Sequence, residues 1–235
     1  MYSAFPLKWL FWPFAWLVLL IFLLVEFSNS LLPLELRITI VPSAALGISY
    51  LVTINPIWRT LWKICPFLGS KFFPDLNGTW DVELQSNWPR QKELIDAATN
   101  NKNEIDYTHI EDSMLAPLKT EKFRAEINQN WFKIEIKLWN PEQNSTIKDS
   151  KTITVSPIRG DGFKPHRLCY FFEQDGFSTS LLDTDNFPGA AIIEYHPESN
   201  TLEGTFWTAR KWQRAINTAG KIKFLKIDPN SSSQP

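Results

Sequence analysis

Two long apolar runs begin the chain, and a pattern of alternating polar and apolar residues follows them. The runs cover residues 9–25 and 38–54, and neither contains a charged side chain. A helix built from either run nearly spans a hydrocarbon core of about 30 Å, at about 1.5 Å of rise per residue. The short stretch between them is rich in serine, asparagine and proline, which favour a turn. The pattern therefore predicts a transmembrane helical hairpin over residues 1–56.

Each run has an alternative interpretation. A cleaved signal peptide is the alternative for the first run, but Lys8 is its only basic flank and no small-x-small cleavage site follows. A buried core helix is the alternative for the second run, whose length alone does not exclude it. Its position directly after another apolar run favours a membrane span. Pro13 and Pro42 are compatible with spanning helices, because neighbouring groups in a membrane satisfy the freed carbonyls.

Basic residues around the runs predict the orientation of the hairpin. Lys8 precedes the first run, and Arg59, Lys63 and Lys71 follow the second. Because lysine and arginine accumulate in cytoplasmic flanks, both termini are expected in the cytoplasm. Tryptophans next to these basic residues are typical of a membrane–water boundary, so residues 57–73 are expected to form an interfacial linker.

Beyond residue 74 the hydrophobic period changes to two. Residues 78–85 alternate so that Trp80, Val82 and Leu84 share one face, as expected of a half-buried strand. Seven further strands are predicted at 123–128, 131–138, 146–158, 167–173, 190–196, 201–210 and 214–227. Eight consecutive strands predict an all-β fold, namely an eight-stranded antiparallel lipocalin-like barrel preceded by the two-helix transmembrane hairpin. The cytoplasmic barrel is expected to cover residues 74–227.

Two segments fall outside this alternating pattern. Residues 87–119 are polar and contain one short helix-like stretch at 91–98, which predicts a long loop or lid between the first two strands. Residues 228–235 are of low complexity and are expected to be disordered.

Charge and motifs exclude several functional classes. The 235 residues carry 24 basic and 25 acidic side chains, so no bulk charge favours a nucleic acid polymer as partner. The first 70 residues hold four basic and two acidic residues, which excludes a soluble cytosolic enzyme. His109, His166 and His196 lack metal-ligand spacing, and the chain contains no P-loop, nucleophile-elbow or dinucleotide-binding motif. The sequence therefore predicts neither an enzyme nor a cofactor.

One combination of features resembles a known family. The Gly-x-Trp of residues 78–80 opens the first strand as in lipocalin-type barrels, and Leu-x-Gly-x-x-x-Thr-x-Arg stands at 202–210. Together with two apolar helices, these motifs resemble the two-transmembrane, β-strand-rich effectors of bacterial cyclic-oligonucleotide-based antiphage signalling systems, from residue 1 to about residue 227. The resemblance implies a barrel that binds a cyclic dinucleotide made by a partner nucleotidyltransferase. It also implies homo-oligomerisation in the inner membrane, contact with membrane lipid, membrane disruption and death of the infected cell.

Five residues are candidates for ligand binding. Thr208 and Arg210 continue the inward alternation of the seventh strand, and an arginine at the mouth of an apolar barrel suits a phosphate or carboxylate. Tyr170 and Tyr195 are expected on inward faces, where their rings could stack on purines. Trp80 is expected to plug the barrel and is the weakest candidate. For Arg210 a solvated position beyond the strand, and for the tyrosines ordinary core packing, remain the alternatives.

The strand at 146–158 is ambiguous. Ser150, Thr152 and Thr154 alternate with Ile153 and Val155, so either set can face the barrel interior.

Three functions follow from these features. The leading one is a ligand-gated antiphage membrane effector. The alternative is a membrane-tethered lipid or fatty-acid binding barrel, in which Arg210 binds a carboxylate. A structural protein whose barrel docks another protein is a third class.

Overall fold

The computed structural model describes residues 7–31, 39–100, 109–142, 147–176 and 186–227. The expected disordered tail lies outside these ranges. The chain forms two compact units, each described by itself below. The first comprises Met1–Asp75 with Gln129–Lys133, and the second comprises Leu76–Asn128 with Ile134–Pro235.

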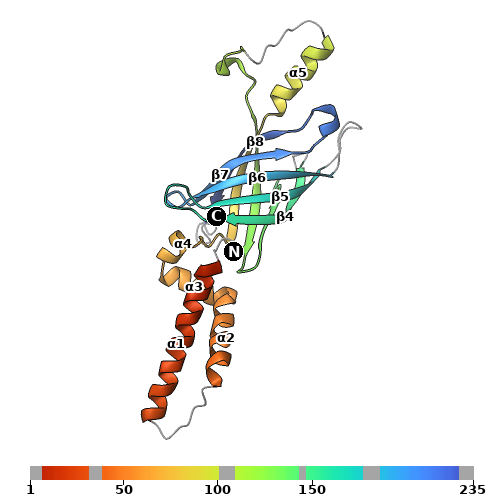
Figure 1. Cartoon of the computed structure of the whole chain (residues 1–235). Helices are drawn as coiled ribbons and strands as arrows, with labels where there is room; N and C mark the ends of the chain where they lie inside the picture. The colour runs from red at the N-terminus through yellow and green to blue at the C-terminus, as the bar shows by residue number, and fades with distance from the viewer. Residues whose placement is uncertain (1–6, 32–38, 101–108, 143–146, 177–185, 228–235) are drawn as a thin grey trace, which may run out of the picture. The chain divides into compact units, whose positions relative to one another are not determined.

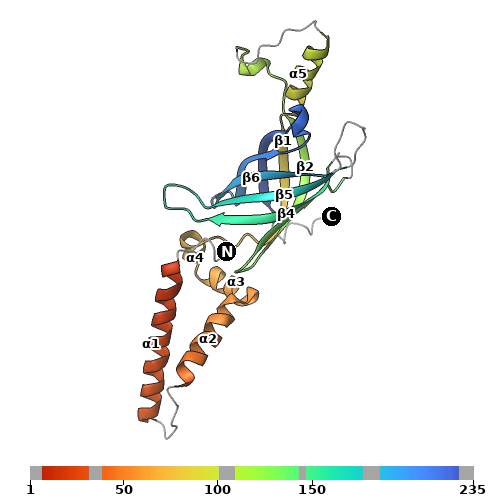
Figure 2. The same cartoon turned by 45° about the vertical axis from the view of Figure 1, so that its right-hand side comes forward.

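The first unit is helical. Its helices are α1 (Leu7–Leu31), α2 (Ile40–Thr53), α3 (Asn55–Ile64) and α4 (Phe67–Lys71). In both views, α1 and α2 lie side by side (Figures 1 and 2). Few of their side chains are buried, namely Val25, Val41 and Ala45. Most apolar side chains of these two helices therefore point away from the protein.

One described helix has the length and composition of a membrane span. The apolar stretch of α1, Phe11–Ser30, is 20 residues long and is 6% buried. By contrast, α2 reaches this length only together with α3, and the two are bent by 78° relative to each other. The structure thus supports one apolar N-terminal helix of spanning length among the described residues, whereas the second span of the expected hairpin stays a prediction.

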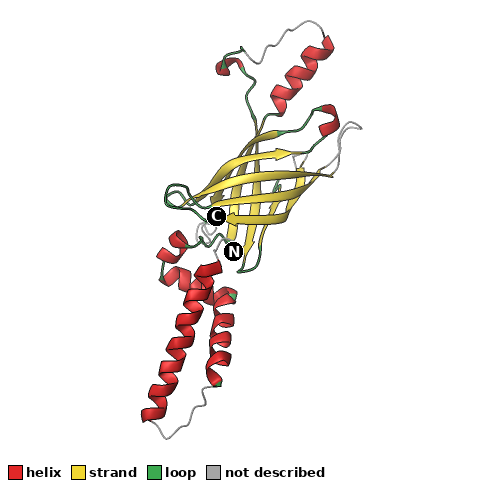
Figure 3. Ribbon diagram, viewed as in Figure 1, coloured by secondary structure: helices red, strands yellow, loops and turns green. Residues whose placement is uncertain are grey.

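The second unit is a closed barrel of eight antiparallel strands in sequential order (Figure 3). The eight-stranded antiparallel barrel expected from the alternating pattern is confirmed. Its strands are β1 (Gly78–Ser86), β2 (Lys119–Gln129), β3 (Ile134–Trp139), β4 (Ile147–Ile158), β5 (Arg167–Gly176), β6 (Asn186–His196), β7 (Thr201–Thr208) and β8 (Ala219–Lys226). We call the two ends of the barrel the Gly78 end and the Ser86 end, after the first and last residues of β1.

The helix predicted after the first strand is longer than expected. Residues Trp88–Asn100 form α5, which follows β1 at the Ser86 end. Asn87 joins this segment to β8, because its backbone N–H donates to the Ala219 carbonyl and its side-chain oxygen accepts from the Ala219 N–H. The Gln91 side chain donates to the Asn217 carbonyl. The start of α5 is therefore attached to the β7–β8 connection.

A β-bulge explains the ambiguous pattern of β4. The pairing of β4 with β5 shifts between Thr152, which pairs with Phe172, and Thr154, which pairs with Phe171. The extra residue, Ile153, is 62% exposed. Before the bulge, Ser150 and Thr152 face inward. Because a bulge reverses the alternation, Val155 and the buried Pro157 face inward after it. Neither of the two expected faces extends over the whole strand.

Trp80 closes the packing at the Gly78 end. Its ring is fully buried, lies edge-to-face with Phe224 and donates from Nε1 to the Leu76 carbonyl at 3.1 Å. The Lys226 ammonium lies 5.3 Å from the centre of the same ring. Trp80 therefore has the plug-like position expected for it.

We expect Trp80→Phe to lower the free energy of unfolding by about 1–3 kcal/mol, because it removes part of a buried ring and the hydrogen bond that this ring donates to the Leu76 carbonyl. Chemical denaturation of the full chain in detergent measures this loss. Trp207→Phe is the matched control, because Trp207 is 45% exposed on the outer surface. Equal midpoints for both variants would contradict the plug role.

Candidate functional site

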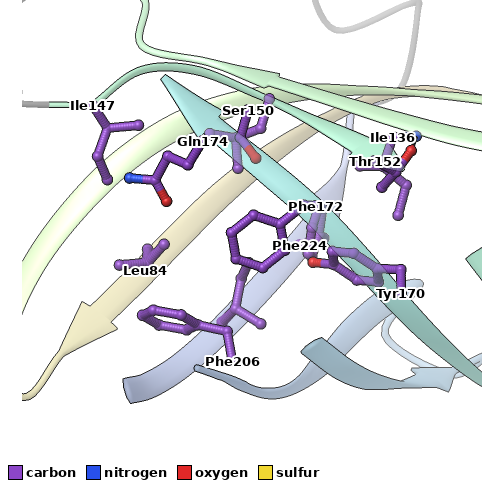
Figure 4. Close-up of a pocket in the computed structure, with 12 residues that line it drawn as sticks. Leu84, Ile136, Ile147, Ser150, Thr152, Tyr170, Phe172, Gln174, Phe206 and Phe224 are labelled. Carbon is purple, nitrogen blue, oxygen red and sulfur yellow. Dashed lines mark hydrogen bonds between the residues drawn. The ribbon is translucent and has the colours of Figure 1, made fainter. Parts of the chain in front are cut away.

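A small cavity lies inside the barrel, toward the Ser86 end (Figure 4). Its volume is about 30 Å³, roughly the space that one water molecule occupies in the liquid. Six strands contribute to its wall, namely β1, β3, β4, β5, β7 and β8, and the wall is mostly apolar. The lining residues are Leu84, Ile136, Leu138, Ile147, Ser150, Thr152, Tyr170, Phe172, Gln174, Phe206, Ile222 and Phe224.

Two buried polar side chains of β5 face this cavity. Tyr170 is 6% exposed and Gln174 is 7% exposed, and both line the cavity wall. Neither the Tyr170 hydroxyl nor the Gln174 amide makes a hydrogen bond to another residue that the structure describes. Buried polar groups in folded proteins almost always have a partner, so each such group calls for water, an ion or a ligand. The cavity therefore offers a hydroxyl and a carboxamide to an incoming molecule.

Burial controls the protonation of the tyrosine. Desolvation is the cause that raises the pKa of Tyr170 far above its usual value. The phenol thus stays protonated at all physiological pH values. It can donate one hydrogen bond into the cavity and accept another.

The other polar residues of the wall come from β4, on the inward side before the bulge. The Thr152 hydroxyl accepts a hydrogen bond from the Ile136 N–H at 2.9 Å, so it also connects β4 to β3. Ser150 is half-buried beside it. The cavity thus has a polar side formed by β4 and β5 and an apolar side formed by β1, β7 and β8.

Two phenylalanine rings narrow the cavity, and each lies close to a glycine. A Cβ atom on Gly189 would come closer than 3.0 Å to the Phe172 ring. A Cβ atom on Gly220 would lie 3.0 Å from the Phe206 ring. Glycine at these positions therefore provides the space that the two rings occupy.

Arg210 lies at the Ser86 end, in the connection that follows β7. Its guanidinium carbon is 5.5 Å from the ring centre of Trp88 and 5.7 Å from that of Phe187, so it makes cation–π contacts with both rings. The side chain is half-buried and does not line the cavity itself. Contacts of a guanidinium with aromatic rings are favourable cation–π interactions, which restrict where the charge lies. Arg210 thus places a positive charge at the Ser86 end of the barrel, which is the end nearer the cavity.

Thr208 is buried but has a structural environment. Its hydroxyl lies 2.8 Å from the Thr218 hydroxyl, and the two backbones are joined by the Thr208 N–H and the Thr218 carbonyl. The predicted inward direction of this strand is correct, since Leu202, Phe206 and Thr208 are all buried. The Thr208 hydroxyl is nevertheless engaged with Thr218, the residue just before β8, rather than with the cavity.

Tyr195 and Trp80 lie away from the cavity. The Tyr195 hydroxyl donates to the Asn200 side chain at 3.2 Å, near the end of β6 that belongs to the Gly78 end. Trp80 occupies that end as described above. Of the five candidates, the structure places Tyr170 in the cavity wall and Arg210 at the neighbouring rim, and it does not bring Tyr195 and Trp80 to the same place.

Gln174 was not among the expected site residues. The alternation Leu168, Tyr170, Phe172 extends to it by one more step, and this signal was available in the sequence. It was not used because the predicted strand ended at residue 173, whereas β5 continues to Gly176. Ser150 and Thr152 were considered but could not be assigned without the bulge.

Within the described ranges, no group of three or more histidine, cysteine or acidic residues could hold a metal ion. His166 lies in the β4–β5 connection, where its Nδ1 accepts from the Gly160 N–H at 3.0 Å. The chemistry that the site offers is therefore binding by hydrogen bonds, aromatic contact and one nearby cation.

Comparison with known proteins adds one relative. The chain is 26% identical over 190 residues to CD-NTase-associated protein 15 of Escherichia albertii, and the aligned region covers 77% of this chain and 80% of the relative. No family model matches the chain. The resemblance drawn from the sequence motifs is confirmed at this level: this chain, which has a closed eight-stranded barrel and an apolar N-terminal helix, is similar to a CD-NTase-associated protein.

Proposed function

We propose that this protein is a non-enzymatic effector of antiphage defence whose barrel binds a cyclic dinucleotide made by a partner nucleotidyltransferase. The observation that carries the proposal is the pair of buried polar groups, the Tyr170 hydroxyl and the Gln174 amide, that face the cavity without a partner among the described residues. The similarity to a CD-NTase-associated protein supports the class of ligand. A carboxamide and a hydroxyl beside aromatic rings are suited to the edge and the face of a nucleobase.

The size of the cavity limits how the ligand enters. A cavity of about 30 Å³ is roughly tenfold smaller than the pockets that hold small organic ligands. Ligand binding therefore requires the Phe172 and Phe206 rings to leave the positions over their glycines. A ligand that binds only the widened barrel shifts the protein toward that state, in proportion to its differential affinity.

Arg210 provides the contact for the phosphates in this proposal. It lies at the Ser86 end of the barrel, the end nearer the cavity, and its cation–π contacts with Trp88 and Phe187 hold the guanidinium there. The phosphates of a cyclic dinucleotide whose bases enter the barrel remain at this rim. A charge-assisted bidentate contact is the strongest hydrogen bond available there.

The membrane part of the proposal rests on the helical unit. We place α1 across the bacterial inner membrane and α2 as the returning segment, with both termini in the cytoplasm. Ligand binding in the barrel then drives homo-oligomerisation, and the oligomer disrupts the membrane and kills the infected cell. The exposed apolar side chains of α1 support its contact with lipid.

The alternative is a barrel for lipids or fatty acids, which the apolar part of the wall favours. Titration of the full-length protein in detergent with cyclic dinucleotides and with a fatty acid separates the two. Saturable binding of a cyclic dinucleotide, with no binding of the fatty acid, is the expected result. Binding of the fatty acid alone would overturn the proposal in favour of the alternative.

Arg210→Ala is expected to weaken binding of the cyclic dinucleotide by about one to two decades, because a charge-assisted contact contributes about 1.5–3 kcal/mol. Arg210→Lys should recover part of the affinity, since it restores the charge without the planar fork. Titrations at two ionic strengths should show a smaller salt dependence for the alanine variant. Arg214→Ala is the matched control, because Arg214 is exposed in the same connection. Equal dissociation constants for wild type and a folded Arg210→Ala variant would show that Arg210 is a solvated side chain that does not bind the ligand.

A further inference from the structure

Helix α3 presents three different faces. Trp58 and Trp62 form the packed face: Trp58 is fully buried, and the Trp62 Nε1 donates to the Phe73 carbonyl at 2.8 Å. Arg59 lies on a second face, where its Nε donates to the Asp75 carboxylate at 2.8 Å. These contacts hold the helix to the segment that follows it.

The third face is apolar and exposed. Ile57, Leu61 and Ile64 follow one another at helical spacing, and they are 37%, 37% and 70% exposed. Phe67, the first residue of α4, is also apolar and is 59% exposed. We call these four residues the α3 apolar face. Exposed apolar residues gathered on one face of an otherwise packed helix mark a site of interaction.

The surrounding charges indicate what covers this face. From residue 36 to residue 74 the chain contains four basic residues and no acidic one. Lys63 is exposed on the side of α3 away from the apolar face, and Lys71 is exposed at the end of α4. Asp75 pairs with Arg59, which leaves the lysines as the exposed charges beside this face. A one-sided apolar stripe flanked by exposed lysines is the pattern of a helix that lies on an anionic bilayer.

The bend before α3 gives a second, independent observation. Helix α2 has 14 residues, or about 21 Å, and α3 leaves its direction by 78°. If α2 runs along the membrane normal, a helix at this angle lies nearly parallel to the membrane surface. Residue 54 is extended and Pro56 stands in the first turn of α3, so the change of direction is built into the backbone.

We propose that α3 and the start of α4 lie in the plane of the membrane surface, with the α3 apolar face inserted among the lipid acyl chains, Lys71 near anionic headgroups and Lys63 toward the aqueous phase. This inference rests on the proposed membrane location of α1 and α2. The inference adds a lipid-binding surface that contacts one leaflet of the bilayer and does not cross it. Because α2 is about 9 Å shorter than a hydrocarbon core of about 30 Å, α3 lies deep in the interface or thins the bilayer around it.

The test uses the full-length protein in vesicles of phosphatidylethanolamine and phosphatidylglycerol. In a Cys65→Ser, Cys169→Ser background, an environment-sensitive fluorophore is attached at Leu61→Cys or Ile64→Cys, or at Lys63→Cys as the control on the opposite side. Lipids brominated on the acyl chain should quench the labels at positions 61 and 64 several-fold more than the label at position 63. Iodide in the aqueous phase should show the reverse order.

Other outcomes overturn the inference. Equal quenching at all three positions would mean that no face of α3 is selected by lipid. Cross-linking of Ile64→Cys between copies, without quenching by brominated lipid, would assign the α3 apolar face to a second copy of the chain. All three positions are exposed, and circular dichroism of each labelled variant confirms that its fold is retained.

A label on α1 separates this inference from the proposed function. Leu20 is 54% exposed in the apolar stretch of α1, and a label at Leu20→Cys should be quenched strongly by brominated lipid. Quenching at Leu20 without quenching at 61 and 64 would overturn the surface position of α3 alone. No quenching at Leu20 would overturn the proposed membrane location of α1, and with it the basis of both.

Discussion

Tyr170→Phe combined with Gln174→Leu is expected to weaken binding of a cyclic dinucleotide by about a hundredfold, while the unliganded barrel becomes as stable as wild type or more stable. Each substitution removes a hydrogen bond of about 1–1.5 kcal/mol to the ligand, and each 1.4 kcal/mol is tenfold in affinity. In the unliganded barrel the same groups are buried without a partner among the described residues, so their loss removes a desolvation cost. Ligand titration and thermal unfolding of the full chain measure the two effects.

Gln129→Leu is the matched control for this prediction. Gln129 is also a buried glutamine, 1% exposed, but its Nε2 donates to the Pro74 carbonyl at 3.1 Å. Its replacement leaves that carbonyl without a donor and should lower stability by about 1–3 kcal/mol. Opposite stability changes at Gln174 and Gln129 are the expected signature. A double variant that binds ligand as tightly as wild type would remove the cavity from the binding site.

Gly204→Ala and Gly220→Ala are each expected to cost about 3 kcal/mol or more of the free energy of unfolding. A Cβ atom at Gly204 would come closer than 3.0 Å to the Ile192 carbonyl oxygen, and one at Gly220 would do the same to the Gln85 carbonyl oxygen. Since both obstacles are backbone atoms of paired strands, relief requires the barrel wall to move. Loss of cooperative unfolding by circular dichroism in detergent is the measurement.

Thr205→Ala provides the comparison for the glycine variants. It removes an exposed side chain next to Gly204 on the same strand, and its unfolding midpoint should stay close to that of wild type. Glycine variants that unfold at the wild-type midpoint would show that the wall of the barrel yields easily. A barrel wall that deforms easily would also lower the free energy needed to widen the cavity for a ligand, so this measurement also tests a part of the proposed function.

Local pattern was sufficient for the order and number of the strands. Each strand of a small barrel has one face inside, so apolar residues recur with a period of two, as Trp80, Val82 and Leu84 do in β1. Eight strands in succession without convincing intervening helices indicated an antiparallel meander, and a sheet of eight strands can close on itself as in lipocalin-type barrels. The apolar stretch of α1 was equally clear, because a run without charges needs no partner to be recognised.

The local sequence pattern could not predict the register between strands or the exact length of each strand. The bulge at Ile153 exists because β4 must fit β5 around a closed barrel, and this constraint joins residues about twenty positions apart in the chain. It decided which hydroxyls of β4 face the cavity. Similarly, β5 continues to Gly176 because its last residues pair with β4 on one side and with β6 on the other, so that Gln174 belongs to the strand and extends its inward face.

The amino-acid sequence alone determined the eight strands, the apolar helix and the inward positions of Tyr170 and Thr208, since all of these depend on neighbours within one element. The sequence did not determine which inward-facing residues lie together around one cavity. Tyr170 and Gln174 share a cavity with residues of β4, whereas Thr208 bonds to Thr218 before β8 and Tyr195 lies at the opposite end. These assignments depend on strand stagger and on close approach at Gly204 and Gly220, which are properties of the closed barrel and not of any single strand.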